Sequence, residues 1–355
     1  MPVDRKFWQG KRVLLTGHTG FKGGWLSLWL QSMGAELCGI ALDPPTSPSM
    51  FVEARVSQGM RSEIFDVRNE VNVRLLFQDF CPEIVIHMAA QPLVRFSYDE
   101  PVSTYATNVM GTVHVLEAAR QTASVRAIVN VTTDKCYENQ EWEWGYRENE
   151  RMGGYDPYSS SKGCSELVTN AYRNSFFSQS GVGLASARAG NVIGGGDWAL
   201  DRLVPDTLRA IEQKIPVSIR NPLAIRPWQH VLEPLSGYLV LAQKLFEDVN
   251  SFSEGWNFGP LDDDAKSVQW IVEEMVETWG QGASWVHDQA MHPHEANYLK
   301  LDISKARQRL HWHPNWTLSI ALEKIIEWHK AWLSHEDMRD FCLGQIKQYE
   351  SSISR

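Results

Sequence analysis

The stretch Val13-Leu-Leu-Thr-Gly-His-Thr-Gly-Phe-Lys-Gly23 decides the fold of this chain. Its first four residues form a short apolar run of the kind found in buried strands. Gly17, Gly20 and Gly23 follow at intervals of three and open a helix-forming segment. Without Cβ atoms the backbone turns tightly, and a pyrophosphate can approach the helix N-terminus, where unpaired amides and the helix dipole favour anions. The stretch therefore predicts the strand, turn and helix of a dinucleotide-binding unit.

Short apolar runs of the same kind recur through the first half of the chain. The further strand candidates are Leu37 to Leu42, Ile84 to Met88, Ala127 to Thr132 and Gly183 to Arg188. Residues at helical spacing predict crossover helices at Gly20 to Met33, Glu70 to Phe80, Val102 to Gln121 and Asp156 to Ser178. Apolar strands that alternate with helices are typical of a parallel sheet covered on both faces. We therefore expect an α/β fold with a doubly wound, parallel, Rossmann-type sheet.

The pattern changes after Gly190, where glycine- and proline-rich turns alternate with isolated helices and short strands. We therefore expect an NAD-binding domain over residues 1–190 and a smaller, irregular C-terminal substrate-binding lobe over residues 191–355. Some elements of the lobe should return to the first domain. Its clearest helices are Asp264 to Trp279 and Leu318 to His335. A lobe over the carboxyl ends of the strands would form a ligand-binding cleft.

The composition narrows the class of protein. The 355 residues are 43% hydrophobic and 22% charged, as in ordinary globular proteins. The net charge of −9 argues against a general nucleic-acid binder. The five cysteines are scattered without CxxC spacing, so the sequence predicts neither disulfides nor a metal site. Since no apolar run approaches ~20 residues and the N-terminus lacks an apolar signal region, we expect a cytoplasmic protein without membrane contact.

Residues after the next strands extend the expected cofactor site. Asp43 lies about 20 residues beyond the glycine loop, where a carboxylate binds a ribose hydroxyl and repels the extra phosphate of NADP, so NAD is the expected cofactor. Asp43 precedes Pro44-Pro45, and a simple turn residue remains the alternative. Residues near the adenine, or where the backbone packs closely on the cofactor, are Asp66, Val67, Ala89, Ala90 and Gln91.

The candidate chemistry lies in Thr132-Thr-Asp-Lys135 and Tyr158-Ser-Ser-Ser-Lys162. Tyr158 and Lys162 are four residues apart on one expected helix, so they share a face and can work as an acid–base pair. The glycine loop, the Thr132 segment and the Tyr158 segment occur in the order that a nicotinamide-dependent short-chain dehydrogenase fold requires. Together they suggest an enzyme of sugar chemistry.

Six motifs in order carry a resemblance to a known family. They are Gly17-His-Thr-Gly-Phe-Lys-Gly23, His87-Met-Ala-Ala-Gln-Pro-Leu-Val-Arg95, Thr132-Thr-Asp-Lys-Cys-Tyr137, Tyr158-Ser-Ser-Ser-Lys162, Arg188-Ala-Gly-Asn-Val-Ile-Gly-Gly-Gly-Asp-Trp198 and Arg226-Pro-Trp-Gln-His-Val231. Over nearly its full length the chain resembles the nucleotide-sugar 4,6-dehydratases, which are extended short-chain dehydrogenases/reductases. It is most similar to the branch that acts on CDP-glucose. The resemblance adds Thr19, Phe21, Lys22 and Asn108 to the cofactor-binding candidates.

The resemblance implies a redox-neutral reaction with NAD, which would convert CDP-D-glucose to CDP-4-dehydro-6-deoxy-D-glucose and water. C4 of the sugar is oxidised, water is lost across C5 and C6, and hydride returns to C6. Tyr158 would take the proton of the C4 hydroxyl, and Thr133 would hydrogen-bond the same hydroxyl. Lys162 would lower the pKa of Tyr158 and hold the nicotinamide ribose. Deoxysugar biosynthesis, including that of lipopolysaccharide O-antigen, is the implied role.

Asp134 and Lys135 are the candidates for the elimination. Dehydratases that act on dTDP-glucose and GDP-mannose have a glutamate in place of Lys135, whereas a lysine matches the CDP-glucose branch. We hypothesise that Lys135 removes the C5 proton and Asp134 protonates the C6 hydroxyl. A lysine base at neutral pH needs its pKa lowered by roughly 3 units from ~10.4, which burial and the positive neighbours Lys162 and NAD would favour. A solvated turn after a strand is the alternative for both residues.

The diphosphate of the substrate needs local positive charge in an acidic protein. Arg226 is the first candidate, because an arginine fork binds phosphate oxygens at two points. Arg202 and Arg220 are equally well explained as surface ion-pair partners. The wider substrate-binding set is Asn191, Arg188, Arg202 and Arg220, to which the resemblance adds Thr133, Val94, Arg95 and Tyr298.

Two other functions stay open at this point. A nucleotide-sugar 4-epimerase uses the same cofactor site and the same Tyr–Lys pair, although Asp134-Lys135 argues against it. A catalytically inert, NAD-sensing regulatory protein should lack Tyr158 or Lys162, and both are present. In folds of this kind the helices Val102 to Gln121 and Asp156 to Ser178 usually pair between subunits, so we expect a homodimer or homotetramer.

Overall fold

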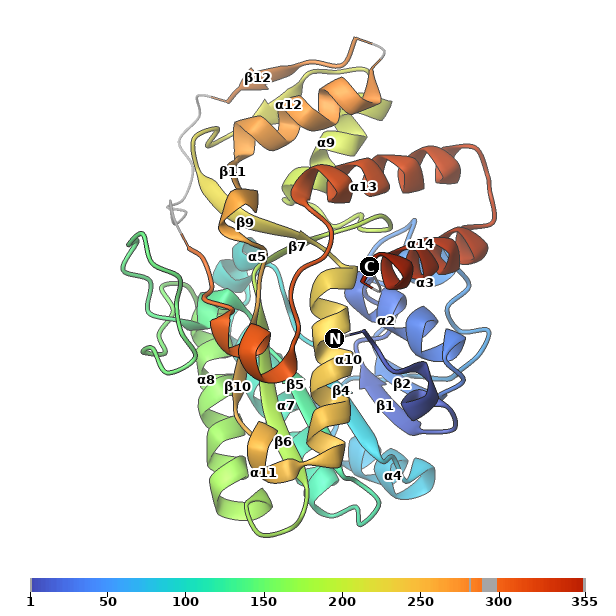
Figure 1. The fold of residues 1–355 in the computed structure, drawn as a ribbon, viewed down its shortest axis with the longest axis vertical. Coiled ribbons are helices and arrows are strands. Elements are labelled where there is room, and N and C mark those ends of the chain that lie inside the picture. Colours follow the sequence, from blue (N-terminus) through green and yellow to red (C-terminus); the bar gives the residue numbers. More distant parts are fainter. Residues whose placement is uncertain (1, 281, 289–298, 354–355) are drawn as a thin grey trace.

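A computed structural model of the chain describes residues 2–280, 282–288 and 299–353. The main sheet of these residues has seven parallel strands in the order β10-β6-β5-β4-β1-β2-β3 (Figure 1). The order reverses at β1, which pairs with both β2 and β4. The expected doubly wound parallel sheet is therefore confirmed. Its strands are β1 (Arg12–Thr16), β2 (Glu36–Ala41), β3 (Arg61–Ile64), β4 (Ile84–His87), β5 (Ala127–Val131), β6 (Gly183–Ala189) and β10 (Gly255–Phe258).

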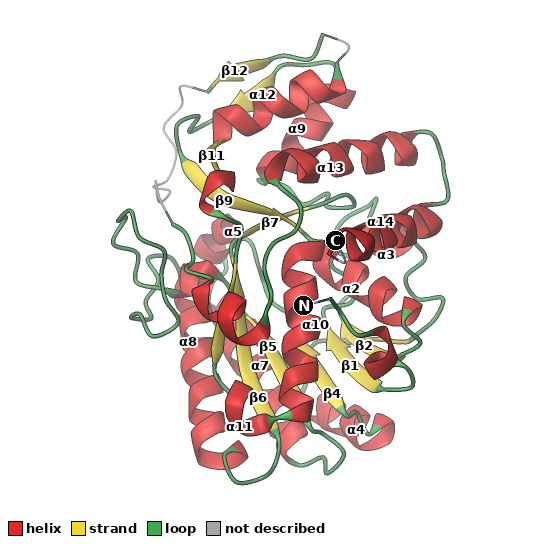
Figure 2. Ribbon diagram, viewed as in Figure 1, coloured by secondary structure: helices red, strands yellow, loops and turns green. Residues whose placement is uncertain are grey.

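Alternate residues of each strand face opposite cores, so helices cover both faces of the sheet (Figure 2). In β1, Val13 and Leu15 belong to one core cluster and Leu14 to the other. α2 (Phe21–Ser32) and α10 (Leu232–Glu247) cover the first face, and α14 (Met338–Ile353) packs against α2. The second face is covered by α4 (Glu70–Phe80), α7 (Gly111–Arg120) and α8 (Pro157–Tyr172).

Two of the expected crossover helices are interrupted by π-helical turns. The segment Val102 to Gln121 consists of α6 (Pro101–Tyr105), a π turn at Ala106–Met110, and α7; a second π turn at Arg173–Phe177 follows α8. The remaining short elements are α1 (Arg5–Trp8), α3 (Met50–Glu53), α5 (Val94–Asp99), α11 (Val249–Phe252), 3₁₀ turns at Asp134–Cys136 and Asp262–Asp264, and a π turn at Ala306–Leu310. In the described part of the chain, every helix is too short or too polar to cross a membrane.

The smaller lobe begins where the chain leaves the carboxyl end of β6 and enters β7 (Asn191–Ile193) almost at once. β7 and β11 (Ala265–Ser267) flank β9 (Ile225–His230), while β8 (Val217–Ile219) pairs with β12 (Trp285–His287). α9 (Leu203–Glu212), α12 (Val268–Trp279) and α13 (Leu318–Leu333) complete it. Because β6 leads directly into β7, the lobe lies at the carboxyl end of the sheet, where Figure 1 shows it.

Two segments of the second half return to the main sheet. β10 pairs in parallel with β6, and α10 packs against β5 and β6. Thirteen of the 16 residues of α10 are buried. A helix that is buried on nearly all sides lacks the apolar stripe of a surface helix, and this explains why periodicity did not predict it.

A buried carboxylate ties α10 to the C-terminal helix. Glu233 accepts hydrogen bonds from the backbone amides of Asn315 and Trp316, at 3.0 and 2.7 Å, and from the hydroxyl of Tyr349 at 2.7 Å. Burial raises the pKa of Glu233 to about 7, although these donors act in the opposite direction. The donors offset the cost of placing a carboxyl group in the core.

This contact predicts that Tyr349→Phe lowers the free energy of unfolding by about 1–3 kcal/mol, because a buried acceptor loses a donor. Tyr238 supplies a matched control, since its hydroxyl is buried without a hydrogen-bond partner among the described residues. Tyr238→Phe should cost nothing or stabilise slightly. Urea denaturation of both variants measures the difference, and equal losses in the two would contradict the prediction.

Candidate active site

The glycine loop closes on itself and on the end of β4. Gly17 has φ +82°, and a Cβ there would lie 2.9 Å from the backbone nitrogen of Ala89. A Cβ at Gly23 would lie 2.0 Å from the carbonyl oxygen of Gly17. Gly20 is the N-cap of α2 and offers no side-chain cap to its first turn. The uncapped helix N-terminus with a backbone free of side chains fits a dinucleotide pyrophosphate.

The other loop residues have different surroundings. Thr19 donates from Oγ1 to the carbonyl of Leu42 at 2.8 Å and so ties the loop to the end of β2. Phe21 reaches the smaller lobe, because a Cβ at Gly194 would lie 2.9 Å from its ring. Burial lowers the pKa of Lys22 to about 8, and the nearby positive charges of Lys162 and Arg202 act in the same direction. Lys22 therefore faces the Tyr158–Lys162 region.

The two acidic candidates differ in availability. Asp43 lies two residues beyond β2 and is exposed. Asp66 is paired with Arg68, with Oδ2 2.6 Å from Nη2. Burial acts to raise the pKa of Asp66, but the hydrogen bonds from Arg68 outweigh it and the net shift is downward. The side chain of Val67 packs in the core against Gly111, so only its backbone remains for a cofactor.

Asn108 holds the segment after β4 in place. Its Oδ1 accepts from the amide of Gln91 at 2.8 Å, and its Nδ2 donates to the carbonyl of Gln91 at 3.1 Å and to Oγ of Ser161 at 2.8 Å. Ala89 donates to Thr16 Oγ1 at 2.9 Å in the same segment. Asn108 is 1% exposed and fully engaged with protein groups. Our assignment of Asn108 as a direct cofactor ligand is therefore wrong, since its amide positions Gln91 and α8 instead.

Tyr158 and Lys162 lie one turn apart in α8 and are 9% and 6% exposed. Burial raises the pKa of Tyr158 to about 12, while a hydrogen bond with Thr133 and the charge of Arg202 act to lower it. The charge of Arg202 therefore acts to lower the pKa of Tyr158, and this is the effect that we expected from Lys162. Burial lowers the pKa of Lys162 to about 8, against the opposing charge of Glu166, and its Nζ donates to the carbonyl of Val131 at 3.2 Å.

Asp134 is a buried carboxylate of which only one oxygen is hydrogen-bonded among the described residues. It is 1% exposed, and Oδ1 accepts from Thr133 Oγ1 at 2.9 Å. Oδ2 has no hydrogen-bond partner among the residues that the structure describes, and a Cβ at Gly190 would lie 2.8 Å from it. A buried carboxylate oxygen without a donor is costly and uncommon in native structures. This oxygen is therefore placed to exchange a proton or a hydrogen bond with a ligand.

Lys135 differs from the sequence expectation. Its side chain is 35% exposed, and Nζ lies 3.8 Å from Oδ1 of Asp134. The side chain is thus only partly buried, and Asp134 places a negative charge beside it, so the role of Lys135 as a base stays a prediction. Asp134 and Lys135 nevertheless lie next to each other at the end of β5, beside Thr133.

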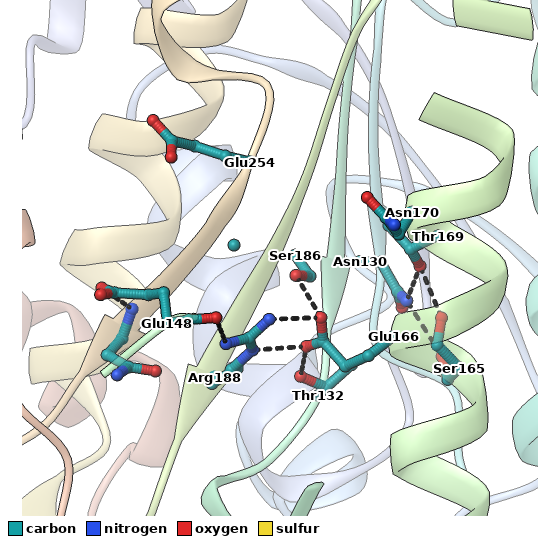
Figure 3. A network of polar contacts seen from close by, with 12 residues as sticks. Asn130, Thr132, Glu148, Ser165, Glu166, Thr169, Asn170, Ser186, Arg188 and Glu254 are labelled. Carbon is teal, nitrogen blue, oxygen red and sulfur yellow. Dashed lines mark hydrogen bonds and ion pairs between the residues drawn. The ribbon is translucent and has the colours of Figure 1, made fainter. Parts of the chain in front are cut away.

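Arg188 is part of the protein interior. It is 5% exposed, and its Nε and Nη2 bind both oxygens of Glu166 at 2.9 and 2.8 Å (Figure 3). Its Nη1 donates to the hydroxyl of Tyr137 at 2.6 Å and to the carbonyl of Glu148 at 2.9 Å. The prediction that Arg188 binds substrate is wrong, because all three guanidinium nitrogens are engaged within the protein.

The other arginines gather where β6 passes into the smaller lobe. Arg95 and Arg220 both pair with Asp201, at 3.2 and 2.8 Å, and Arg202 pairs with Asp197 at 2.8 Å. These are the ion pairs that the alternative explanation of Arg202 and Arg220 expects, yet the charge of Arg202 also acts to lower the pKa of Tyr158.

The structure places the other candidates as follows: Val94 begins α5, Ala90 follows β4, Asn191 begins β7, Arg226 lies in β9, and Tyr298 is outside the described residues.

Two contributors were not recognised in the sequence. Ser97 Oγ accepts the backbone amide of Tyr158 at 3.2 Å and so fixes the start of α8. Glu166 follows Lys162 by four residues on the same helix face and opposes the lowering of its pKa. The repeated interval of four from Tyr158 through Lys162 to Glu166 was the available signal.

The buried ammonium of Lys162 predicts a cost in stability. Its pKa falls from 10.5 to about 8 on folding, so at pH 7 the folded state carries the full burial cost of about 3 kcal/mol. As the pH rises from 8 to 10.5 the folded lysine becomes neutral and this cost disappears. Lys162→Met should therefore raise the free energy of unfolding at pH 7 by up to about 3 kcal/mol, with a gain that shrinks above pH 8.

Urea denaturation of wild type and variant at both ends of this pH range tests the prediction. Lys135→Met is the matched control, because the 35% exposed side chain of Lys135 carries no comparable burial cost. A gain for Lys162→Met that is absent, or that is independent of pH, would contradict the analysis.

Comparisons with known proteins show the family to which the chain belongs. The family model described as GDP-mannose 4,6 dehydratase matches residues 14–325. The CDP-glucose 4,6-dehydratase of Salmonella typhimurium is 61% identical over 99% of this chain and 100% of that protein, and the dTDP-D-glucose 4,6-dehydratase of Mus musculus is 23% identical over 90% and 89%.

Solved structures share the fold. The UDP-glucose 4-epimerase of Thermotoga maritima with UDP-glucose has a TM-score of 0.79 at 21% identity, covering 90% of this chain and 99% of that one. The dTDP-glucose 4,6-dehydratase of Bacillus anthracis in complex with NAD has a TM-score of 0.75 at 20% identity, covering 90% and 97%. On the match to the family model and to the Salmonella relative, the chain belongs to the GDP-mannose 4,6-dehydratase family of nucleotide-sugar-modifying enzymes.

Proposed function

We propose that this protein is an NAD-dependent CDP-glucose 4,6-dehydratase, a hydro-lyase. The observation that carries the proposal is the buried carboxylate of Asp134, whose Oδ2 has no partner among the described residues and which bonds through Oδ1 to Thr133, the neighbour of Tyr158. A Tyr–Lys pair alone can take the proton of the C4 hydroxyl. An acid beside it can also protonate the C6 hydroxyl, and elimination of water requires this. The substrate is proposed from the 61% identity to a CDP-glucose 4,6-dehydratase.

NAD fits the residues at the carboxyl edge of the sheet. The uncapped N-terminus of α2 would hold its pyrophosphate, and the exposed carboxylate of Asp43 would bind the adenosine ribose and disfavour NADP. Lys162 would bind the nicotinamide ribose. When bound, NAD supplies the acceptor for the hydride of C4 and later returns it to C6. Three solved structures with the same fold, among them a dTDP-glucose 4,6-dehydratase, contain NAD, in line with such a site.

Oxidation at C4 needs a group that takes the hydroxyl proton. Tyr158 takes it as a phenolate, and Thr133 hydrogen-bonds the same oxygen. The pKa of about 12 in the ligand-free protein is high for this task, so positive charge must stabilise the phenolate. Arg202 already acts in this sense, and Lys162 lies one turn from Tyr158.

Elimination needs a base at C5 and an acid at C6. Once C4 is a carbonyl, the C5 proton is acidic, and we assign its removal to Lys135. Asp134 Oδ2 donates a proton to the departing C6 hydroxyl, which leaves as water. The two side chains are neighbours, with 3.8 Å between Lys135 Nζ and Asp134 Oδ1, so the proton taken at C5 can return to the carboxylate used at C6.

The diphosphate is assigned to the arginines of the smaller lobe. Arg202, Arg220 and Arg226 keep this role, whereas Arg188 is excluded by its burial in the ion pair with Glu166. Arg95 and Arg220 share Asp201 as a partner, so one carboxylate is held by two guanidinium groups. A net positive charge therefore remains in this cluster, which suits a dianionic ligand.

A 4-epimerase is the second candidate. The similarity in fold to the UDP-glucose 4-epimerase of Thermotoga maritima favours it. An epimerase needs the Tyr–Lys pair and a pocket in which a 4-keto sugar can rotate, but no acid at C6. The buried Asp134 argues for the dehydratase, and the retained Tyr158 and Lys162 argue against an inert sensor.

We also propose that the protein is a homodimer or homotetramer in the cytoplasm, where nucleotide-activated sugars are made. Large apolar side chains lie exposed along α6 to α8, as an interface between helices requires: Val102 is 81% exposed and Leu167 60%. An apolar surface along these helices is a candidate for a subunit interface. Sedimentation at several protein concentrations would measure the assembly.

The proposed function is tested by incubating the protein with CDP-, UDP-, dTDP- and GDP-linked hexoses, with and without added NAD, and following product mass. Loss of one water from CDP-glucose alone is the expected result. An unchanged mass with an inverted stereocentre would establish the epimerase instead. Cofactor binding without turnover of any substrate would point to the sensor.

Because Lys135 is assigned as the base at C5 and Asp134 as the acid at C6, variants of the two residues should stop the reaction at different steps. Lys135→Ala should still oxidise C4 but should not exchange the C5 hydrogen with deuterium from solvent. Asp134→Asn should exchange C5 yet release water on the order of 10²–10⁴-fold more slowly, since it lacks the acid at C6. Mass spectrometry of sugar recovered from deuterated buffer separates the two outcomes. Normal dehydration by Lys135→Ala would show that the base is another group.

A further inference from the structure

The face of α8 that carries Tyr158 and Lys162 continues to Glu166, again four residues on. Glu166 is 5% exposed and lies one helical turn beyond Lys162 in α8. A fully buried glutamate needs a partner, because an unpaired carboxylate in the core is strongly disfavoured. The identity of its partners defines what this residue does.

Glu166 is held by Thr132, which follows β5, and by Ser186 and Arg188 of β6 (Figure 3). One oxygen accepts from Thr132 Oγ1 at 2.5 Å and from Arg188 Nε at 2.9 Å. The other accepts from Ser186 Oγ at 2.6 Å and from Arg188 Nη2 at 2.8 Å. The carboxylate is therefore fully satisfied, and it joins α8 to the residue that directly precedes Thr133.

The partner arginine reaches the other end of the same segment. We call residues Thr132 to Tyr137 the catalytic loop. Arg188 Nη1 donates to the Tyr137 hydroxyl at 2.6 Å, and the guanidinium lies 5.1 Å from the centre of the Tyr137 ring. Tyr137 donates in turn to Asn257 Oδ1 at 2.8 Å. Both ends of the catalytic loop are thus held by one ion pair, through Thr132 on Glu166 and through Tyr137 on Arg188.

The charges of this pair are stable. Burial acts to raise the pKa of Glu166, but Arg188 and the two hydroxyl donors outweigh it and the net shift is downward. The pKa of Arg188 is raised well above its usual range by Glu166, although burial opposes this. The pair stays ionised, so its geometry persists and does not switch with pH near neutrality.

We propose that the Glu166–Arg188 ion pair is a positioning device for dehydration, which holds Asp134 and Lys135 in place relative to Tyr158 and Lys162. The proposal rests on the proposed function of the site. Neither residue of the pair touches substrate, and both act through Thr132 and Tyr137. Elimination requires an acid and a base to be set simultaneously against C6 and C5, so it should be more sensitive to the catalytic loop than oxidation at C4.

The test removes each link and leaves the ion pair intact, because loss of one buried partner can unfold the protein. Thr132→Val keeps the size of the side chain and removes the hydroxyl that binds Glu166. Tyr137→Phe removes the hydroxyl between Arg188 and Asn257. In each variant, kcat for CDP-glucose should fall by about tenfold or more with KM changed less than about twofold, as expected when geometry and not binding is lost.

Two further readouts separate positioning from general damage. In a single turnover, C4 oxidation should continue while water loss slows, so the absorbance of reduced nicotinamide should accumulate. Amide hydrogen exchange over residues 132–137 should become faster.

Thr169→Val is the matched control: Thr169 is buried in the same helix and accepts from Asn130 Nδ2 at 2.7 Å, but it does not reach the catalytic loop. It should leave kcat and the exchange over 132–137 unchanged.

Wild-type kcat in both Thr132→Val and Tyr137→Phe would overturn the proposal, as would an equal loss of kcat in Thr169→Val. A wild-type protein that does not dehydrate CDP-glucose would instead overturn the proposed function. In that case amide hydrogen exchange still tests whether the Glu166–Arg188 pair positions residues 132–137. Faster exchange over 132–137 in Thr132→Val, but not in Thr169→Val, would support it, and equal exchange would reject it.

Discussion

The buried ion pair between Glu166 and Arg188 is the interaction on which the catalytic half of the molecule depends. The strands of a parallel sheet are covered on both faces, so charged side chains between a strand and a helix need buried partners. Between α8 and strands β5 and β6, this need is met by one carboxylate with four donors and one guanidinium with all three nitrogens bound. Breaking such a pair typically costs about 3–5 kcal/mol, so the helix, the strand ends and the loop between them have one arrangement.

The groups assigned to chemistry contrast with this satisfied pair. Lys162 is buried with its pKa lowered to about 8, Tyr158 has its pKa raised to about 12, and Asp134 keeps an oxygen without a partner among the described residues. At neutral pH the buried ammonium of Lys162 and the unpaired oxygen of Asp134 cost stability in the absence of a ligand, whereas Tyr158 is neutral in the folded and the unfolded chain. Perturbed groups that gather at one point, beside a network that is fully bonded, are characteristic of an active site. In the proposal made above, the bonded network holds these perturbed groups in position.

The glycine loop adds a second constraint, because its backbone packs closely on itself and on the residues after β4. Gly23 lies so near the carbonyl of Gly17, and Gly17 so near Ala89, that no side chain fits at either place. The first turn of α2 is thereby pressed against the ends of β1 and β4, at the point where the strand order reverses. Phe21 extends this packing to Gly194 in the smaller lobe. The glycine loop and the smaller lobe therefore contact each other directly.

The sequence by itself determined the parallel sheet, its crossover helices, the glycine loop and the Tyr158–Lys162 pair. These follow from local periodicity and from residues a few positions apart. It did not determine α10 or β10, because a helix buried on nearly all sides has no apolar stripe, and the sequence Gly-Trp-Asn-Phe of β10 is not a continuous apolar run. The roles of the polar residues were likewise open. Arg188 and Arg202 look alike in sequence, yet one meets Glu166 in the core and the other lies near Tyr158.

The same holds for Asn108, which binds Gln91 and Ser161, and for Lys135, which is partly exposed beside Asp134. Only the tertiary structure decided these matters, because burial and the choice of partner depend on residues that are distant in the chain. The motifs indicate which reactive side chains are present. The packing determines which of them lack hydrogen-bond partners within the protein and can therefore act on a substrate.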